Sequence, residues 1–404
     1  MENSQVDIRY LFVIIFVMAD FLSYGKQWID DNDIEVVIAT LKSDYLTQGP
    51  EVEKFEKKIC EITGAKYCLA VSNGTAALHL AALALEIEKG AEGITTPNTF
   101  AASANCLAYA GIKPVFADIR HDTYNISLDE IKKHATDKTK VIVAVDFAGQ
   151  PADLPEIYAW AKEKNIFVIE DAAHAIGSKY ADGSSVGSCK YSDITTFSFH
   201  PVKTITTAEG GAITTNDEKI YQRLSLLRTH GITKSAELLS QNPGPWYYEM
   251  QELGYNCRLT DMQAALGTSQ LGRLSKFVDR RREIVEKYNQ AFSGVENLTV
   301  PFEEPGLASA FHLYVLQFDF AKIGKNRKEI MELLKAEGIG TQVHYIPVHL
   351  QPYYQKNFGY KLGDFPVAEA YYEQALSLPL FPKMTDDDIE RVILAVKKVA
   401  GCQK

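Results

Sequence analysis

The sequence contains few cysteines, and none has the paired spacing that metal and redox sites use. The six cysteines are isolated, no two form a Cys-X-X-Cys pair, and no group of histidines accompanies them. A zinc site and a thioredoxin-like redox site therefore have little support. Isolated cysteines suit a reducing compartment, so we expect a cytoplasmic protein. The six are Cys60, Cys68, Cys106, Cys189, Cys257 and Cys402.

The sequence also lacks an excess of positive charge. Its 42 Lys and Arg residues against 52 Asp and Glu residues give a formal net charge of −10. Nucleic-acid-binding surfaces need basic side chains to neutralise phosphates, so we expect no nucleic-acid partner. A local pocket for one phosphorylated small molecule is compatible with this charge. With 404 residues and 46% hydrophobic content, the chain can bury a sizeable core and form two domains.

Long hydrophobic runs are absent, apart from one short segment near the N-terminus. Residues 10–19, YLFVIIFVMA, are strongly apolar but span about half the length that a transmembrane helix requires. A signal peptide or anchor is one interpretation, yet no small-residue cleavage site follows. A short strand or helix, or an extension ahead of a native start at Met18, explains the segment better. We therefore expect no membrane association, and we interpret residues 1–23 as an N-terminal extension.

Two nucleotide-binding signatures are missing as well. No Gly-X-Gly-X-X-Gly follows the first predicted strand, and no Gly-X-X-X-X-Gly-Lys-Ser/Thr occurs. Nicotinamide-dependent and P-loop functions therefore lose their main support. No internal repeat or low-complexity linker interrupts the chain.

Short apolar runs alternate with helical patterns through the first two thirds of the chain. Each run is continuously apolar, which is typical of parallel strands covered by helices on both faces. Ligands of such sheets bind at the carboxyl ends of the strands. The runs are KYCLAV, KPVFADI, KVIVAVDF and IFVIEDAA, and residues 33–43 and 51–63 predict two preceding amphipathic helices.

The pattern changes near residue 272. Residues 274–292 predict a long charged helix, followed by an α+β tail that contains FHLYVLQFDF and a closing helix near 387–400. We therefore predict an α/β protein with a large domain over residues 24–271 and a smaller one over residues 272–404.

Three segments after predicted strands carry the residue types that cofactor chemistry requires. The first is SNGTAAL, which follows the first of the apolar runs. Gly74 permits close approach of a ligand, and Thr75 begins a helix whose free amides favour a phosphate. An ordinary strand-to-helix turn with a capping Ser or Asn explains this segment at least as well.

The second segment is VIEDAAHAIG. Asp171 ends a hydrophobic strand, where a carboxylate is costly unless it has a cationic partner, such as a protonated heterocyclic nitrogen. His174 follows one helical turn later and could face the same site. A helix-capping aspartate and a core histidine are the alternatives.

The third segment is SFHPVKTITTAEGGAITTND, in which Lys203 stands among small and hydroxyl residues. An amine in a partly dry pocket has a lowered pKa and can act as a Schiff-base nucleophile. A phosphate site, a strand-end carboxylate and a sheltered lysine are together what pyridoxal 5′-phosphate (PLP) requires. Asp171 would keep the ring nitrogen protonated, Lys203 would bind the cofactor covalently, and Phe100 could cover the ring.

These motifs resemble those of the DegT/DnrJ/EryC1/StrS family of fold-type I, PLP-dependent nucleotide-sugar aminotransferases. The resemblance runs from about Tyr24 to the C-terminus. It implies an α/β fold with a large, mostly parallel α/β/α sheet domain and a smaller α+β C-terminal domain. It rests on YLTQGP, SNGTAALH, TTPNTFAASAN, VIEDAAHAIGS, FSFHPVKTITTAEGGAITTND, RTHGI, GYNCRLTDMQAALG and GTQVHYIPVH.

The resemblance also implies a role for individual residues. Lys203 is the Schiff-base lysine, Asp171 the partner of the ring nitrogen, and His174 a contact on the oxygen side of the ring. The other implied cofactor contacts are Gly74, Thr75 and Ser198 at the phosphate, Phe100 on the ring, and Asn256, which reaches the phosphate in the neighbouring subunit. We therefore expect a homodimer whose active sites are shared across the interface. Implied substrate contacts are Tyr24, Asp44, Tyr45, Leu46, Thr47, Gln342, Val343, His344 and Tyr345.

Within this family, the segment AEGG at residues 208–211 resembles the C4-aminating branch, whereas C3-aminating enzymes tend to carry Asp-Gly-Gly. The combination of YLTQGP, VDFAGQPADL, SFHPVKTITTAEGGA and VHYIPVH is most similar to enzymes of pseudaminic acid biosynthesis. Those enzymes aminate C4 of a UDP-4-keto-6-deoxy-N-acetyl-L-altrosamine-type sugar with L-glutamate as donor.

Other functions stay open. Enzymes that act on a UDP-4-keto-pentose for lipid A modification share SFH…K and AGxPAD, and perosamine- and bacillosamine-type enzymes come next. A regulator that binds PLP or sugar without turnover belongs to another class, and the intact pair of Lys203 and Asp171 disfavours it. Dehydratase relatives that replace the lysine by histidine are excluded because Lys203 is present.

Overall fold

The computed structural model describes residues 21–401. Most of the expected extension over residues 1–23 lies outside them, including the candidate start at Met18. Of the last three residues of that extension, Leu22 is buried, and its N–H donates to the Gly338 carbonyl oxygen at 2.8 Å. The chain therefore contacts the C-terminal part of the fold from Leu22 onward.

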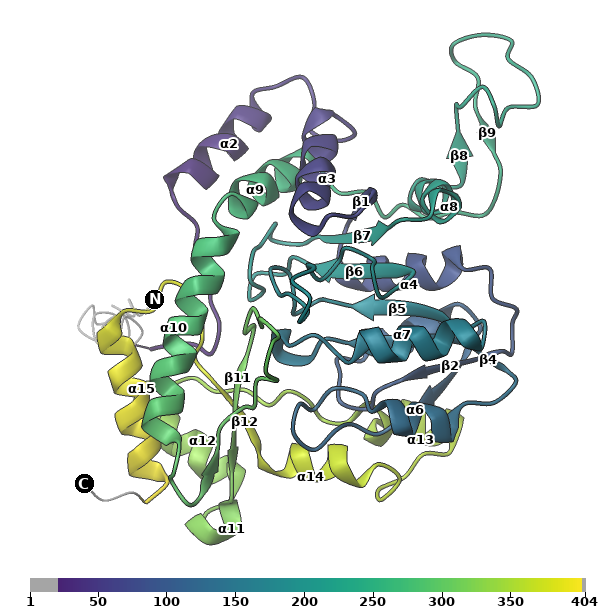
Figure 1. The fold of residues 1–404 in the computed structure, drawn as a ribbon. Coiled ribbons are helices and arrows are strands. Elements are labelled where there is room, and N and C mark those ends of the chain that lie inside the picture. The colour runs from purple at the N-terminus through teal and green to yellow at the C-terminus, as the bar shows by residue number, and fades with distance from the viewer. Residues whose placement is uncertain (1–20, 402–404) are drawn as a thin grey trace, which may run out of the picture.

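A seven-stranded sheet forms the centre of the molecule (Figure 1). Its strands are β1 (Tyr67–Val71), β2 (Glu92–Thr95), β3 (Lys113–Phe116), β4 (Thr139–Val145), β5 (Phe167–Asp171), β6 (Ile194–Ser198) and β7 (Gly211–Thr215). They lie in the order β1-β7-β6-β5-β4-β2-β3. Strand β7 runs antiparallel to both of its neighbours, and the other neighbours pair in parallel. The prediction of a mostly parallel sheet is confirmed.

Helices cover both faces of this sheet. They are α3 (Pro50–Thr63), α4 (Gly74–Ala84), α5 (Ala102–Tyr109), α6 (Leu128–His134), α7 (Leu154–Glu163), α8 (Glu218–Arg228) and α9 (Asp261–Leu271). Successive strand residues point to opposite faces, so Val141 and Val143 of β4 pack with α4, α5 and α8. Ile142 and Ala144 belong to the core on the other face, with α3, α6, α7 and α9. The continuous apolar runs of the sequence are explained by this double coverage.

The first described helix, α2 (Asp31–Leu41), packs against α9. It begins two residues earlier than the predicted start at residue 33, because Asp30 caps it: the Asp30 carboxylate accepts from the Asp33 N–H at 3.1 Å. The predicted helix at 51–63 is α3, which begins one residue earlier at Pro50.

A second core lies around α10 (Leu274–Phe292), which has the bounds that the sequence predicted. It includes a three-stranded antiparallel sheet of β10 (Leu298–Thr299), β11 (Tyr314–Phe318) and β12 (Ala375–Leu378). Helix α15 (Asp386–Val399) lies beside α10 (Figure 1). The remaining C-terminal helices are α11 (Phe320–Ile323), α12 (Arg327–Ala336), α13 (Pro352–Phe358) and α14 (Pro366–Gln374), and short 3₁₀ turns span Phe147–Gly149 and Val348–Leu350.

A hairpin of β8 (Ile232–Thr233) and β9 (Glu249–Met250) projects from the molecule beyond α8 (Figure 1). Its loop exposes the large side chains of Trp246 and Tyr248. Within residues 21–401, every helix is too short or too polar to cross a membrane.

Candidate active site

A cavity of about 650 Å³ lies where β4, β5 and β6 end and α4 begins. This is the edge at which the sequence predicted ligand binding, because the carboxyl ends of parallel strands meet there. The cavity also receives side chains from the C-terminal part of the chain. The predicted site residues that line it are Tyr24, Gly74, Thr75, Phe100, Asp171, His174, Ser198, Lys203, His344 and Tyr345.

The N-terminus of α4 forms one wall of the cavity. The Asn73 side chain caps this helix by accepting from the Ala76 N–H at 2.8 Å. The amides of Gly74 and Thr75, the first two of the helix, have no acceptor within it. A helix N-terminus of this kind favours an anion such as a phosphate. A capping Asn is thus present, as the alternative interpretation required, and it leaves the anion site intact.

Asp171 ends β5 and is 4% exposed. Its Oδ2 accepts from the Ser103 hydroxyl at 2.6 Å, and its Oδ1 accepts from the Ala173 N–H at 3.1 Å. Burial raises the pKa of Asp171, while these two hydrogen bonds and the charge of Lys203 oppose the rise. The residues after Asp171 form turns rather than a helix, so the helix-capping alternative for this aspartate is wrong.

Lys203 lies in the turn after β6, half-buried in the cavity wall. Burial lowers the pKa of its amine to about 8, and the charge of Asp171 limits the decrease. Within residues 21–401, the Lys203 Nζ forms neither a hydrogen bond nor an ion pair. A larger fraction of this amine is therefore neutral near pH 8 than for an ordinary lysine, and the amine is available to a ligand.

His174 is buried in the cavity wall beside a second histidine that the sequence analysis did not single out. Its Nε2 lies 3.1 Å from the Tyr345 hydroxyl, and the His312 ring centroid is 4.5 Å from its own. Burial, followed by the charge of Lys203, holds the pKa of His174 far below its ordinary value, so the ring is neutral. The Nδ1 atoms of both rings are buried without a partner among residues 21–401. Buried polar nitrogens without a partner are uncommon in folded proteins.

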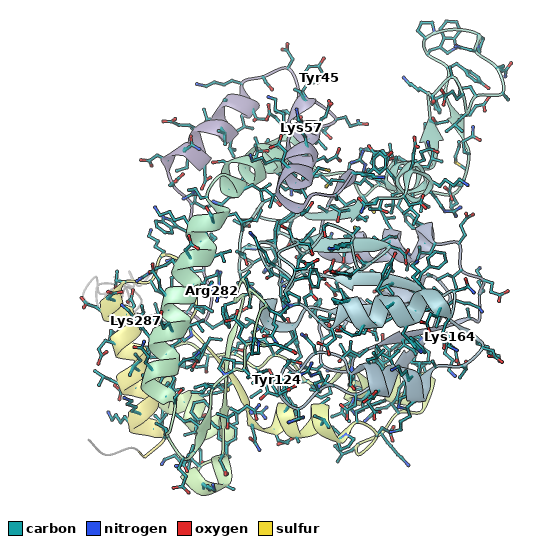
Figure 2. The ribbon with its side chains drawn as sticks, viewed as in Figure 1. Tyr45, Lys57, Tyr124, Lys164, Arg282 and Lys287 are labelled. Atoms are coloured by element: carbon teal, nitrogen blue, oxygen red, sulfur yellow. The ribbon has the colours of Figure 1, made fainter. Side chains whose placement is uncertain are left out.

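Other predicted residues lie outside this cavity. Asn256 is exposed and its backbone pairs with Thr229. Figure 2 shows Tyr45 on the peripheral loop between α2 and α3, and the four residues Asp44, Tyr45, Leu46 and Thr47 are all exposed. Gln342 and Val343 precede the two cavity residues His344 and Tyr345 but do not line the cavity themselves.

Ser103 and His312 are two polar cavity residues to which the sequence analysis assigned no role. Ser103 stands in the quoted motif TTPNTFAASAN, three residues after Phe100, on the first turn of α5. His312 interrupts an apolar run just ahead of β11. Two sequence signals could have identified them. Ser103 carries a hydroxyl one helical turn from the aromatic residue expected to cover the ring, and His312 is a histidine inside an apolar run.

Similar proteins with known structures have this fold. Helicobacter pylori PseC, an aminotransferase involved in the biosynthesis of pseudaminic acid, is 31% identical with a TM-score of 0.88, over 95% of this chain and 100% of that one. The Streptococcus pneumoniae protein Spr1654, solved in a PLP form, is 31% identical with a TM-score of 0.86, over 94% and 99% of the two chains. The fold is that of the PLP-dependent aminotransferases.

Sequence comparison assigns the family. Residues 27–397 match the DegT/DnrJ/EryC1/StrS aminotransferase family, and the chain belongs to it. The Bacillus subtilis spore coat polysaccharide biosynthesis protein SpsC is 45% identical over 380 residues, which are 94% of this chain and 97% of that protein. The protein is accordingly a sugar aminotransferase that uses PLP.

The cavity suits this cofactor. Gly211 of β7 allows the start of α4 to approach, since a Cβ there would lie 2.5 Å from the Asn73 carbonyl oxygen. The capped N-terminus of α4 suits the phosphate of PLP, and the buried Asp171 suits its protonated ring nitrogen. The unpaired Lys203 amine suits its aldehyde group.

Proposed function

We propose that this protein aminates C4 of a UDP-4-keto-6-deoxy-N-acetylhexosamine of the L-altrosamine type, with L-glutamate as donor, in pseudaminic acid biosynthesis. The observation that carries the proposal is the likeness to H. pylori PseC along nearly the whole of both chains. The segment AEGG supports amination at C4, and its residue Glu209 lines the cavity.

PLP, when bound, acts as an electron sink and carries the amino group from donor to sugar. Gly74, Thr75 and Ser198 would hold its phosphate at the start of α4. Asp171 would keep a proton on the ring nitrogen, because the buried carboxylate offers that nitrogen an ionic hydrogen bond. Phe100 would cover one ring face, and His174 would lie on the oxygen side of the ring.

Lys203 would both attach the cofactor and move protons. With a pKa of about 8, its Nζ is deprotonated often enough to act as a nucleophile. Once released by an incoming amine, the same Nζ would take up and return the proton at the carbon that gains or loses nitrogen. Tyr24, His344 and Tyr345 are the proposed substrate contacts that line the same cavity as Lys203.

The proposed working unit is a homodimer in which Asn256 of the partner subunit completes the phosphate site. The proposed substrate contacts Asp44, Tyr45, Leu46 and Thr47, which lie outside the cavity of their own chain, would act in the same way. Residues 24–271 and 272–404 are proposed as two domains that share the cavity. The cysteines at described positions are all free thiols, which supports a cytoplasmic location.

A second candidate is C4 amination of another nucleotide-linked keto sugar. The 45% identity to SpsC, named for spore coat polysaccharide biosynthesis, favours it. The UDP-4-keto-pentose, perosamine and bacillosamine types belong to this group. Sugar stereochemistry is recognised through a few contacts, so close relatives can differ in it.

The test is incubation of the purified protein with L-glutamate and a panel of UDP- and GDP-linked 4-keto sugars, followed by mass spectrometry and NMR of the product. We expect a 4-amino-4,6-dideoxy sugar of L-altro configuration, and none with the Lys203→Ala variant. A 4-amino product from another sugar alone would select the second candidate. Absence of product from every sugar would favour the regulator, and borohydride labelling would then show whether Lys203 carries PLP.

A further inference from the structure

Two buried hydroxyl groups lie in line behind the Asp171 carboxylate. The Ser103 Oγ is 2.6 Å from Asp171 Oδ2, and the Thr99 Oγ1 is 2.7 Å from the Ser103 Oγ. Thr99 and Ser103 are 2% and 1% exposed. The three groups therefore form a largely buried hydrogen-bonded chain in the cavity wall.

Counting protons fixes the direction of this chain. An ionised carboxylate only accepts, and each hydroxyl has one proton to donate. If Ser103 donates its proton to Asp171, then Thr99 must donate to Ser103. Hydroxyls in series polarise one another, so the bond that reaches Asp171 is stronger than one from an isolated serine. The Ala173 N–H occupies the other carboxylate oxygen at 3.1 Å, so both oxygens are held and the carboxylate cannot rotate.

The same turn carries the aromatic residue that is proposed to cover the cofactor ring. Phe100 lies between Thr99 and Ser103, and its carbonyl oxygen accepts from the Ser103 N–H at 3.2 Å. The Ser103 hydroxyl thus connects the segment that bears Phe100 to the strand end that bears Asp171, which is 68 residues away along the chain.

We propose that Ser103, supported by Thr99, is a positioning residue that keeps the Asp171 carboxylate ionised and oriented for a protonated ring nitrogen. This rests on the proposed role of Asp171 toward PLP. The proposal for Ser103 is based on the chain of hydrogen bonds from Thr99 through Ser103 to Asp171. This chain forms without the cofactor.

Neutral hydrogen-bond donors and one lysine are the groups that stabilise the ionised form of Asp171. Burial raises the pKa of Asp171, and the Ser103 hydrogen bond is the largest influence that lowers it. Around it, burial disfavours the charged forms of the neighbouring titratable groups, so Lys203 is the main charged partner. Those neighbours are Cys106 on α5, Asp146 after β4, His174 after β5, and Tyr345.

The test compares two ligands that differ only at the ring nitrogen. Pyridoxamine 5′-phosphate and its 1-deaza analogue both bind without attachment to Lys203, so their affinities for the apoprotein report on the cavity alone. We expect wild type to bind the nitrogen-containing ligand more tightly. In Ser103→Ala this preference should fall about tenfold, which is the size of one hydrogen bond to a charged group. The deaza affinity should be unchanged.

Three further variants separate a positioning role from general damage. Thr99→Val should reduce the preference less than Ser103→Ala, and the double variant should reduce it no further, because Thr99 acts through Ser103. Thr99→Ser, which keeps the hydroxyl, should behave as wild type. Asp171→Asn should abolish the preference.

The outcomes distinguish this inference from the proposed function. A preference that persists undiminished in both Ser103→Ala and Thr99→Val would overturn the role of Ser103 and leave Asp171 in place. Equal loss of affinity for both ligands would also overturn it, since that is the result of a merely structural role. A wild-type protein that does not discriminate between the ligands would instead overturn the role of Asp171, and that of Ser103 with it.

Discussion

Gly74 and Ser198 lie so close together that a Cβ on the glycine would sit 2.8 Å from the Ser198 Cβ and 3.1 Å from its Oγ. Helix α4 begins at Gly74 and strand β6 ends at Ser198. The strand end and the helix start therefore converge on one side of the cavity, and only a residue without a side chain allows this approach.

Gly74→Ala should destabilise the apoprotein by about 1–3 kcal/mol, the usual cost of overpacking a tight contact. Alanine is otherwise the better helix former, so a loss of stability would have to come from the clash with Ser198. The double variant Gly74→Ala/Ser198→Gly should recover most of the loss, because the obstructing atoms are gone. Urea unfolding of the apoproteins measures both effects, and a Gly74→Ala variant as stable as wild type would contradict the close approach.

Lys203 should react with PLP at a lower pH than an ordinary lysine. Its amine has a pKa of about 8 because it is buried. The attacking form is the neutral amine, so the rate of covalent attachment to the apoprotein should rise with pH to a midpoint near 8. Stopped-flow absorbance gives this rate, and a lysine amide in solution, with a pKa of about 10.4, is the reference.

Asp171→Asn provides the matched control for Lys203. The Asp171 charge raises the pKa of the amine, so its removal should shift the midpoint downward. A wild-type midpoint near that of free lysine would show that Lys203 is solvated in the apoprotein.

Glu170 and Asp146 should make the protein less stable as the pH rises. Burial raises the pKa of both carboxyl groups, and the charge of Glu170 further raises that of Asp146. The folded state then binds more protons than the unfolded state between the ordinary carboxyl pKa and the raised one. The stabilisation is complete below that window and is lost as the pH rises through it.

Glu170→Gln should flatten this dependence at pH values above the ordinary carboxyl pKa. The quantity to compare is the slope of the unfolding free energy against pH, because Gln cannot replace every hydrogen bond of Glu170 and the variant will lose stability at every pH. Glu170 accepts from the hydroxyl of Tyr180, from that of Thr195 at 2.5 Å and from the Gly187 N–H at 3.3 Å. Glu163→Gln, at an exposed position on α7, should leave the slope unchanged. An unaltered slope in Glu170→Gln would mean that the pair is already ionised in the fold.

Much of the site could be predicted because its parts are local. Gly74 and Asp171 stand at the ends of buried apolar runs, and the topology of a parallel sheet brings such positions to one edge. The bounds of α10 could be predicted for a similar reason, since its charged face repeats with helical period over 19 residues.

What could not be predicted depends on contacts between distant segments. Strand β7 (Gly211–Thr215) is buried on both faces, so its composition does not reveal that it runs antiparallel to β1 and β6. The bond from Ser103 to Asp171 requires knowing that the first turn of α5 faces the end of β5. His312 reaches His174 from a segment more than 130 residues further along the chain.

Asn256 should act in the active site of the partner subunit. It is exposed and lies outside the cavity of its own chain, so it can reach a phosphate only from another copy. The following helix, α9, packs against α2 and α3 of the same chain. The family resemblance and this placement are the grounds for the prediction.

Mixing Lys203→Ala with Asn256→Ala subunits tests the prediction, because a heterodimer with shared sites would carry both lesions in one site and neither in the other. After complete exchange of equal amounts, confirmed by native mass spectrometry, about a quarter of all sites would be intact, and activity should rise toward about a quarter of the wild-type value. Lys203→Ala mixed with wild type calibrates the activity of a dimer with one intact site. If the exchanged mixture is no more active than its Asn256→Ala component alone, Asn256 acts within its own chain or has no part in the site.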